Sequence, residues 1–235
     1  MDVKVEIWSD VVCPWCAIGK RRFEKALARF AHRDEVEVSF HSFELDPEAP
    51  REPTGDLAGH LAAKYGVSRA QADQMHRQMT GTAAADGWEF HFERARRGNT
   101  FDAHRVLHLA AGHDVQDAVK ERLLRGYFTE GEAISDHATL ARLAAEAGLD
   151  ADEVRTVLAS DAYADAVRAD ERQAQAYGIT AVPFFVVDRR YGVAGAQPPE
   201  ALLEVLETAW AEAHPPQVLT PAADPSSCAD GSCST

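Results

Sequence analysis

Two cysteines near the start of the chain, spaced as Cys-Pro-Trp-Cys at positions 13–16, constrain its fold more than any other feature. The alternating run Val3–Trp8 before them predicts a β-strand, and the amphipathic stretch Ala17–Phe30 after them predicts a helix. Two thiols in the first turn of a helix can close a small disulfide. The unpaired N–H groups and the dipole of the helix favour the thiolate form of the first thiol, which is the form that attacks disulfides. Strand, cysteine pair and helix together therefore predict a redox site.

The four cysteines of the chain form two close pairs, Cys13/Cys16 and Cys228/Cys233. Thiols of a reducing compartment are more often catalytic or redox-sensing than structural. A single zinc site built from both pairs is the competing interpretation, but its C-x2-C and C-x4-C spacing is loose. His104 and His108 stand four residues apart on a predicted helix and have no evident third ligand. We therefore expect no metal and no other cofactor.

Charge and hydropathy narrow the range of partners. A formal net charge of −14 over 235 residues argues against nucleic acid and against anionic membrane surfaces. No apolar stretch approaches the roughly 20 residues of a membrane span. The sequence does not begin with a basic segment followed by an apolar one and a cleavage site, as a secretory signal does. The expected location is the cytoplasm.

The rest of the chain divides into two strand-containing parts and a long helical one. Val36–Phe43 alternates and predicts a second strand, so that the first part is a β–α–β unit. Phe184–Asp188 and Tyr191–Gly195 predict a hairpin, and Pro199–Ala213 predicts the last helix. Between the two parts, the expected helices are Asp56–Tyr65, Arg69–Met79, Ala103–Ala111, Val115–Phe128, His137–Ala147, Ala151–Ala159 and Tyr163–Tyr177, with glycines such as Gly81 at their ends and Ser68 as an N-cap.

The helical part, of roughly 120 residues, is too long for a connecting loop in a compact domain, so we predict an inserted subdomain. The fold class is then α/β. Residues 1–45 and 178–214 form a split sheet domain, and 54–177 form the helical insertion. The composition of residues 215–235 is typical of a flexible tail.

Several segments resemble the DsbA-like family of thiol–disulfide oxidoreductases, and within it the FrnE-type branch. The resemblance covers about residues 3–212 and implies a thioredoxin fold with a large all-helical insertion between its βαβ and ββα halves. Some FrnE-like proteins also carry a second cysteine pair in the tail. The segments that carry the resemblance are Ser9–Cys16, Ile18-Gly19, Asn99–Arg105, Thr180–Phe185 and Gly195–Gln197.

This resemblance implies a role for each residue of the redox site. Cys13 is the exposed nucleophile, Cys16 is the buried resolving thiol, and Pro14 and Trp15 tune the pair. Val182-Pro183 forms a cis-proline loop that faces the cysteines and can pair with an extended substrate peptide. The alternative for this proline is an ordinary position at the start of a strand.

The reaction implied is thiol–disulfide exchange with disulfide-containing or thiol-containing proteins, in the direction of oxidation, reduction or isomerisation. A thioredoxin-type or glutathione-type system would recycle the site, in a setting such as oxidative stress. DsbA itself has a histidine at the position of Trp15, and an uncharged indole stabilises a thiolate less. We therefore predict a reduction potential below the ~−120 mV of DsbA, closer to the thioredoxin and glutaredoxin range.

Cys228 and Cys233 enclose four residues, Ala-Asp-Gly-Ser, which favour a turn and permit an internal disulfide. The linker of about fifteen residues after Ala213 has a root-mean-square reach of about 22 Å, and a compact body of this size has a radius of gyration of about 17 Å. We predict that the tail pair passes redox equivalents to Cys13/Cys16. The alternatives are thiols without a role and a metal-capture tag.

Four further residues are candidates for a substrate groove. Trp88 and Phe90 belong to an alternating, extended segment that suits either an apolar peptide-binding lip or the hydrophobic core. Asn99 and Arg105 fall in a family-like segment. A helix cap at Asn99 and a surface ion pair between Asp102 and Arg105 would explain them equally well.

Other functions remain compatible with this scaffold. It resembles the kappa-class glutathione transferases and the 2-hydroxychromene-2-carboxylate isomerases, which have a serine in place of Cys13 and lack a resolving cysteine. Cys16 argues against such a glutathione-dependent isomerase. A polyketide-type enzyme that still uses Cys13, or a holdase that needs no thiol, would also fit the sequence.

Overall fold

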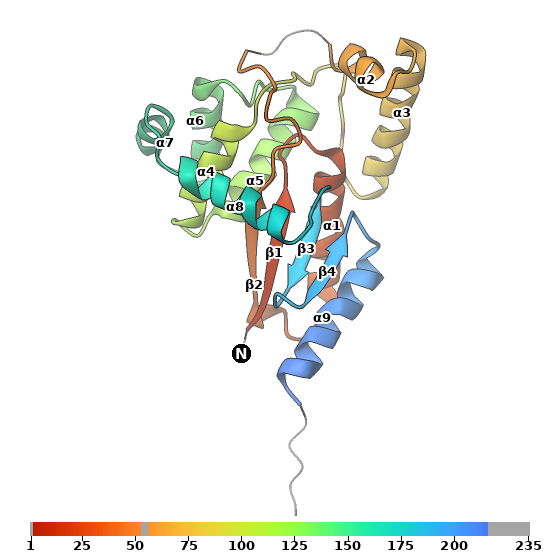
Figure 1. Cartoon of the computed structure of the whole chain (residues 1–235), viewed down its shortest axis with the longest axis vertical. Helices are drawn as coiled ribbons and strands as arrows, with labels where there is room; N and C mark the ends of the chain where they lie inside the picture. The colour runs from red at the N-terminus through yellow and green to blue at the C-terminus, as the bar shows by residue number, and fades with distance from the viewer. Residues whose placement is uncertain (1, 53–55, 216–235) are drawn as a thin grey trace, which may run out of the picture.

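The computed structural model describes residues 2–52 and 56–215, and its centre is a four-stranded sheet with the order β2-β1-β3-β4 (Figure 1). Strands β1 (Val3–Ser9) and β2 (Val36–Ser42) run parallel. Strand β3 (Phe184–Val187) is antiparallel both to β1 and to β4 (Tyr191–Ala194). The sheet therefore joins two segments that are far apart in the sequence.

Helix α1 connects β1 to β2, helices α2 to α8 lie between β2 and β3, and α9 follows β4. A β–α–β unit and a β–β–α unit are thus separated by a helical insertion, as the sequence predicts. The helices are α1 (Pro14–Arg29), α2 (Leu57–Tyr65), α3 (Arg69–Ala85), α4 (Phe101–Ala111), α5 (Gln116–Arg125), α6 (His137–Glu146), α7 (Ala151–Leu158), α8 (Ala164–Ala176) and α9 (Pro199–Ala213), with a 3-10 turn at Arg33–Glu35 and a π-helical turn at Gly126–Glu130.

Alternate residues of the strands face opposite helical layers, as the two-residue period of a strand requires. In β1, Val5 and Ile7 pack with residues of α1 and α9, whereas Trp8 packs with Ala174 of α8. The indole N–H of Trp8 also donates to the Asp170 carbonyl of α8, 3.0 Å away. Helices therefore cover both faces of the sheet, and five of the seven residues of β1 are buried (Figure 1).

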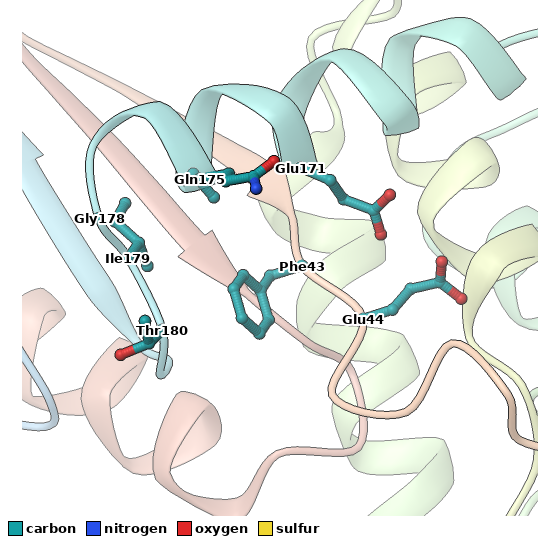
Figure 2. A pocket seen from close by; sticks show the side chains of 8 residues that line it. Phe43, Glu44, Glu171, Gln175, Gly178, Ile179 and Thr180 are labelled. Carbon is teal, nitrogen blue, oxygen red and sulfur yellow. The ribbon is translucent and has the colours of Figure 1, made fainter.

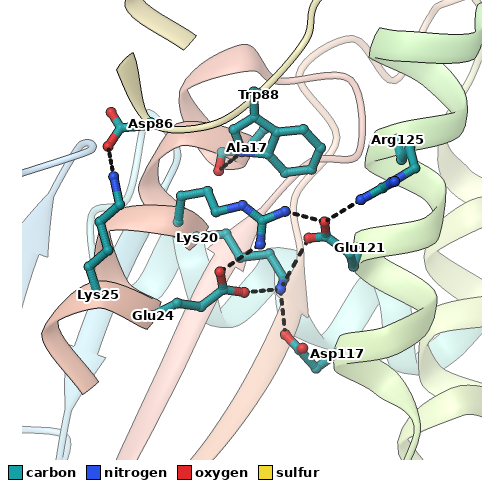
Figure 3. A network of polar contacts seen from close by, with 10 residues as sticks. Ala17, Lys20, Glu24, Lys25, Asp86, Trp88, Asp117, Glu121 and Arg125 are labelled. Carbon is teal, nitrogen blue, oxygen red and sulfur yellow. Dashed lines mark hydrogen bonds and ion pairs between the residues drawn. The ribbon is translucent and has the colours of Figure 1, made fainter. Parts of the chain in front are cut away.

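Ion pairs join the sheet domain to the insertion through α1 and α5 (Figure 3). The buried ammonium of Lys20 on α1 lies 2.9 Å from Asp117 of α5. Arg21 binds Glu121 of α5, and its guanidinium stands 4.7 Å above the Trp88 ring. These contacts fix α5 against the helix that carries the cysteines.

Two of the differences from the sequence-based helix boundaries involve a glycine. Helix α3 continues through Gly81 to Ala85, because four helix-compatible residues follow the glycine. The predicted helix Val115–Phe128 instead changes at Gly126 from α-helical to π-helical hydrogen bonding. The predicted N-cap at Ser68 is confirmed, since its hydroxyl accepts the N–H of Gln71 in a capping box.

Candidate redox active site

The helix start positions both cysteines. Cys13 is the N-cap of α1, and Pro14 takes the first helical position, where no backbone N–H is needed. The carbonyl of Cys13 accepts the N–H groups of Cys16 and Ala17, at 3.1 Å and 3.3 Å. Both cysteines are free thiols. The Cys-Pro-Trp-Cys segment therefore forms the first turn of the helix, as its spacing predicts.

The segment before β3 brings Val182 and Pro183 to this turn. The bond between them is cis, as the resemblance implies. The thiol of Cys13 donates to the Val182 carbonyl oxygen, with 3.6 Å between Sγ and O. The carbonyl of Pro183 accepts the N–H of Gly195 at 2.8 Å, which anchors the loop to the end of β4. The structure thus brings the predicted nucleophile and the predicted substrate loop together.

The expectation that Cys13 is exposed is wrong. Cys13 exposes only 4% of its surface and Cys16 exposes 3%, because the loop that holds Val182 lies against the thiol. Trp15 is the most exposed residue of the motif, with 43% of its surface accessible to solvent. The indole is therefore the first side chain of the motif that an approaching protein would meet.

A buried lysine lies within electrostatic range of the thiols. Lys120 of α5 is fully buried, and within the described part of the chain its ammonium has no hydrogen-bond partner. Burial lowers the pKa of Lys120, and the charges of Cys16, Asp10 and Cys13 act in the opposite direction. Burial also raises the pKa of Cys16 well above its usual value, and the charge of Lys120 opposes that rise. The ammonium is thus placed to stabilise a Cys16 thiolate.

Asp10 and His104 complete this buried polar group. One oxygen of Asp10 accepts the Leu45 N–H at 2.8 Å, and the other lies 3.3 Å from Nε2 of His104, at ion-pair distance but without hydrogen-bond alignment. Burial alone would raise the pKa of Asp10, but the contact with His104 brings it below its usual value. The backbone carbonyl of Asp10 accepts the N–H of Cys13 at 3.4 Å. Asp10 therefore links the buried charges to the nucleophile.

Two residues of this buried group, Asp10 and Lys120, have no role predicted from the sequence. One signal was present for the lysine, because Lys120 shares a helix face with Val119, Leu123 and Leu124, which are apolar and buried. A charged residue on an otherwise apolar face needs a buried partner or a function.

The aromatic candidates do not form a groove. Trp88 and Phe90 expose 4% and 3% of their surfaces and belong to the core of the insertion. The indole N–H of Trp88 donates to the Ala17 carbonyl of α1 at 2.8 Å, and Phe90 stacks on Phe128. Of the two interpretations, the hydrophobic core is therefore correct.

The polar candidates also have structural partners. The side-chain oxygen of Asn99 accepts the N–H of Phe101 at the start of α4. Arg105 forms the expected pair with Asp102, at 2.7 Å, but it is buried and also donates to the Ala162 carbonyl at 2.8 Å. The ion pair expected at the surface is therefore largely buried. Arg105 also connects α4 to the loop before α8.

Cys228 and Cys233 lie outside the described residues. Within 2–52 and 56–215, no three His, Cys, Asp or Glu side chains are grouped so as to hold a metal ion. Of the two histidines considered as ligands, His104 contacts Asp10 and His108 contacts Asp170. None of the described helices combines the length and the apolar character that a membrane crossing requires.

The model of the DSBA-like thioredoxin domain matches residues 4–207. The chain belongs to this family. A probable DsbA oxidoreductase from Streptomyces coelicolor is 49% identical, with a TM-score of 0.86 over 94% of each chain. The fold is therefore a DsbA-like thioredoxin fold, and the family supports an oxidoreductase.

Two further relatives are more distant. The uncharacterized protein YwbO from Bacillus subtilis is 29% identical over 80% of this chain and 88% of its own length. The cytosolic disulfide reductase DsbM from Pseudomonas aeruginosa, solved with GSH, is 19% identical, with a TM-score of 0.61 over 88% of this chain and 98% of its own. At that identity, the likeness to DsbM concerns the fold alone.

Proposed function

We propose that this DSBA-like protein is an oxidoreductase and isomerase of protein disulfides that works through Cys13 and Cys16. The observation that carries the proposal is the 3.6 Å contact between the Cys13 sulfur, at the start of α1, and the Val182 carbonyl. The edge of that loop offers backbone groups to an extended peptide beside the reactive sulfur.

The exchange follows from two attacks by sulfur. The Cys13 thiolate attacks one sulfur of a substrate disulfide, so that a mixed disulfide forms and the other substrate sulfur leaves as a thiolate. The Cys16 thiolate then attacks the Cys13 sulfur and releases the second substrate thiolate. Two electrons pass from the cysteine pair to the substrate, and the pair becomes a disulfide. Oxidation of a substrate dithiol is the same sequence in reverse.

Variants of the two cysteines test this function. Cys13→Ser should abolish insulin reduction and scrambled-ribonuclease refolding, because it removes the attacking sulfur. Cys16→Ser should still attack but should accumulate the mixed disulfide, which intact-protein mass spectrometry detects as a substrate adduct. Activity that survives Cys13→Ser would contradict the proposal and favour a function that needs no thiol, such as a holdase.

We also propose that the tail pair exchanges redox equivalents with Cys13/Cys16. The reach expected of the linker supports this step. The double variant Cys228→Ser/Cys233→Ser should then lower steady-state insulin turnover severalfold while leaving the first single turnover of the reduced protein unchanged. Unchanged steady-state turnover would contradict the relay.

The cellular setting is a separate proposal. We place the protein in the cytoplasm, in the FrnE-type branch and in oxidative-stress repair, with recycling by a glutathione-type or thioredoxin-type system. The motifs around Cys13, which resemble the FrnE-type branch, support this placement.

A further inference from the structure

A pocket of about 240 Å³ opens beside the loop that faces Cys13 (Figure 2). The segment after β2, the last turns of α8 and the segment that leads to Val182 enclose it. Phe43, Ala174 and Ile179 give it an apolar lining. Glu44 and Glu171 stand together at one side, as Figure 2 shows. The pocket is therefore apolar in one part and acidic in another.

This pocket lies within reach of a substrate bound at the cysteines. Thr180 lines it and stands two residues before Val182, whose carbonyl contacts the Cys13 sulfur. A step of two residues spans at most about 7.2 Å between Cα atoms. A peptide paired with this loop would thus carry a side chain into the pocket from a position two or three residues away from its reactive cysteine.

The acidic part carries more negative than positive charge when both carboxyl groups are ionised. The side chain of Glu44 is fully buried, and Arg168 of α8 donates to both Glu44 and Glu171, at 2.8 Å and 2.7 Å. The amide of Asn99 is the other neighbour of Glu44, at 3.2 Å. One guanidinium thus faces two carboxylates. The carbonyl end of α8, which also borders the pocket, adds the negative end of a helix dipole.

We propose that this pocket binds the lysine or arginine side chain of a protein substrate whose reactive cysteine lies two or three residues away. The apolar lining accepts the methylene stem, Glu171 accepts the charged head group, and the buried carboxylate of Glu44 behind it adds negative charge. The proposal rests on the disulfide exchange proposed above and adds a substrate class to it. The net charge of −14 also favours the approach of basic proteins.

A matched pair of peptides tests the preference. Each peptide contains one disulfide, and the two differ only in a lysine or a norleucine placed two residues from the reactive cysteine, on either side in separate pairs. We expect kcat/KM for reduction to be about tenfold higher for the lysine peptide, as for a hydrogen-bonded ion pair at a partly buried site. The rate of each peptide with free glutathione corrects for intrinsic disulfide reactivity.

Two variants should remove this preference, so that kcat/KM becomes equal for the lysine and norleucine peptides. Glu171→Gln removes one carboxylate, and Gln175→Lys places an ammonium at the pocket from an exposed position of α8. Glu207→Gln is the control, because it removes an equal charge from an exposed position of α9. We expect the control to keep the tenfold ratio.

The preference should also depend on pH. Burial and the neighbouring Glu171 raise the pKa of Glu44 to about 7, and Arg168 opposes them. A bound cation stabilises the ionised form of Glu44, so the lysine-to-norleucine ratio of kcat/KM should rise between pH 6 and pH 8. The ratio cancels the titration of the thiols, which both peptides share. Glu44→Gln should flatten the rise.

The outcomes separate the two proposals. Failure to reduce any peptide would overturn the proposed function. Reduction of both peptides with equal kcat/KM would overturn the pocket and leave the function standing. A preference for lysine that persists in both Glu171→Gln and Gln175→Lys would also overturn the pocket.

Discussion

Replacing Lys120 by methionine should slow closure of the Cys13–Cys16 disulfide severalfold at pH 7. Cys16 must lose its proton before it attacks, and burial already raises its pKa. The ammonium of Lys120 opposes that rise, so its loss should move the pH profile of closure to higher pH. The measurement follows reduced protein after mixing with oxidised glutathione, with acid quenching and mass spectrometry of the mixed disulfide.

Lys64→Met is the matched control for this prediction. Lys64 is exposed on α2, and its replacement changes the net charge equally. Closure in this variant should keep the rate and the pH profile of the unmodified protein. Identical profiles for Lys120→Met and the unmodified protein would mean that the buried charge does not act on Cys16.

Alanine at Gly19 should destabilise the protein and impair insulin reduction. A Cβ atom at this position of α1 would lie 2.7 Å from Cγ of Pro183 and 3.5 Å from Cβ of Ala196. Such overpacking costs about 1–3 kcal/mol and outweighs the gain in helix propensity, which is at most about 1 kcal/mol. The strain should push the loop away from Cys13. Urea unfolding and insulin turnover measure the two effects.

Gly81→Ala provides a control of the opposite sign. Gly81 also lies inside a helix, but no atom would lie within 4 Å of its added Cβ. This variant should gain up to about 1 kcal/mol of unfolding free energy and keep full activity. Equal stability of Gly19→Ala and Gly81→Ala would show that α1 and the loop can move apart without cost.

The elements that the sequence predicts well are those that local patterns specify. The alternation of Val3–Trp8 predicts a strand with one buried face. In the structure both faces of this strand are covered by helices. Ser68 and Gln71 are three residues apart and cap a helix without help from the rest of the chain. Gly81 misled the prediction because glycine favours a helix end without enforcing one, and the residues that follow Gly81 continue the helix.

The setting of the active site could not be predicted in the same way, because contacts between distant segments create it. The alternating pattern around Trp88 suits a groove as well as a core. Only the burial of its indole, which donates to the Ala17 carbonyl, assigns Trp88 to the core. Nothing near Lys120 in the sequence indicates that the fold places it within range of Cys16. The exposure of Cys13 depends on the loop at Val182, far along the chain.

The helical insertion supplies part of the chemistry as well as part of the structure. Helix α5 carries Lys120 and is held to the cysteine helix by the ion pairs of Lys20 and Arg21 (Figure 3). The Cys-Pro-Trp-Cys motif alone therefore does not contain all the groups that act on its thiols. Grafted onto a minimal scaffold without α5, it would bring two sulfurs but not the charge of Lys120 that acts on them.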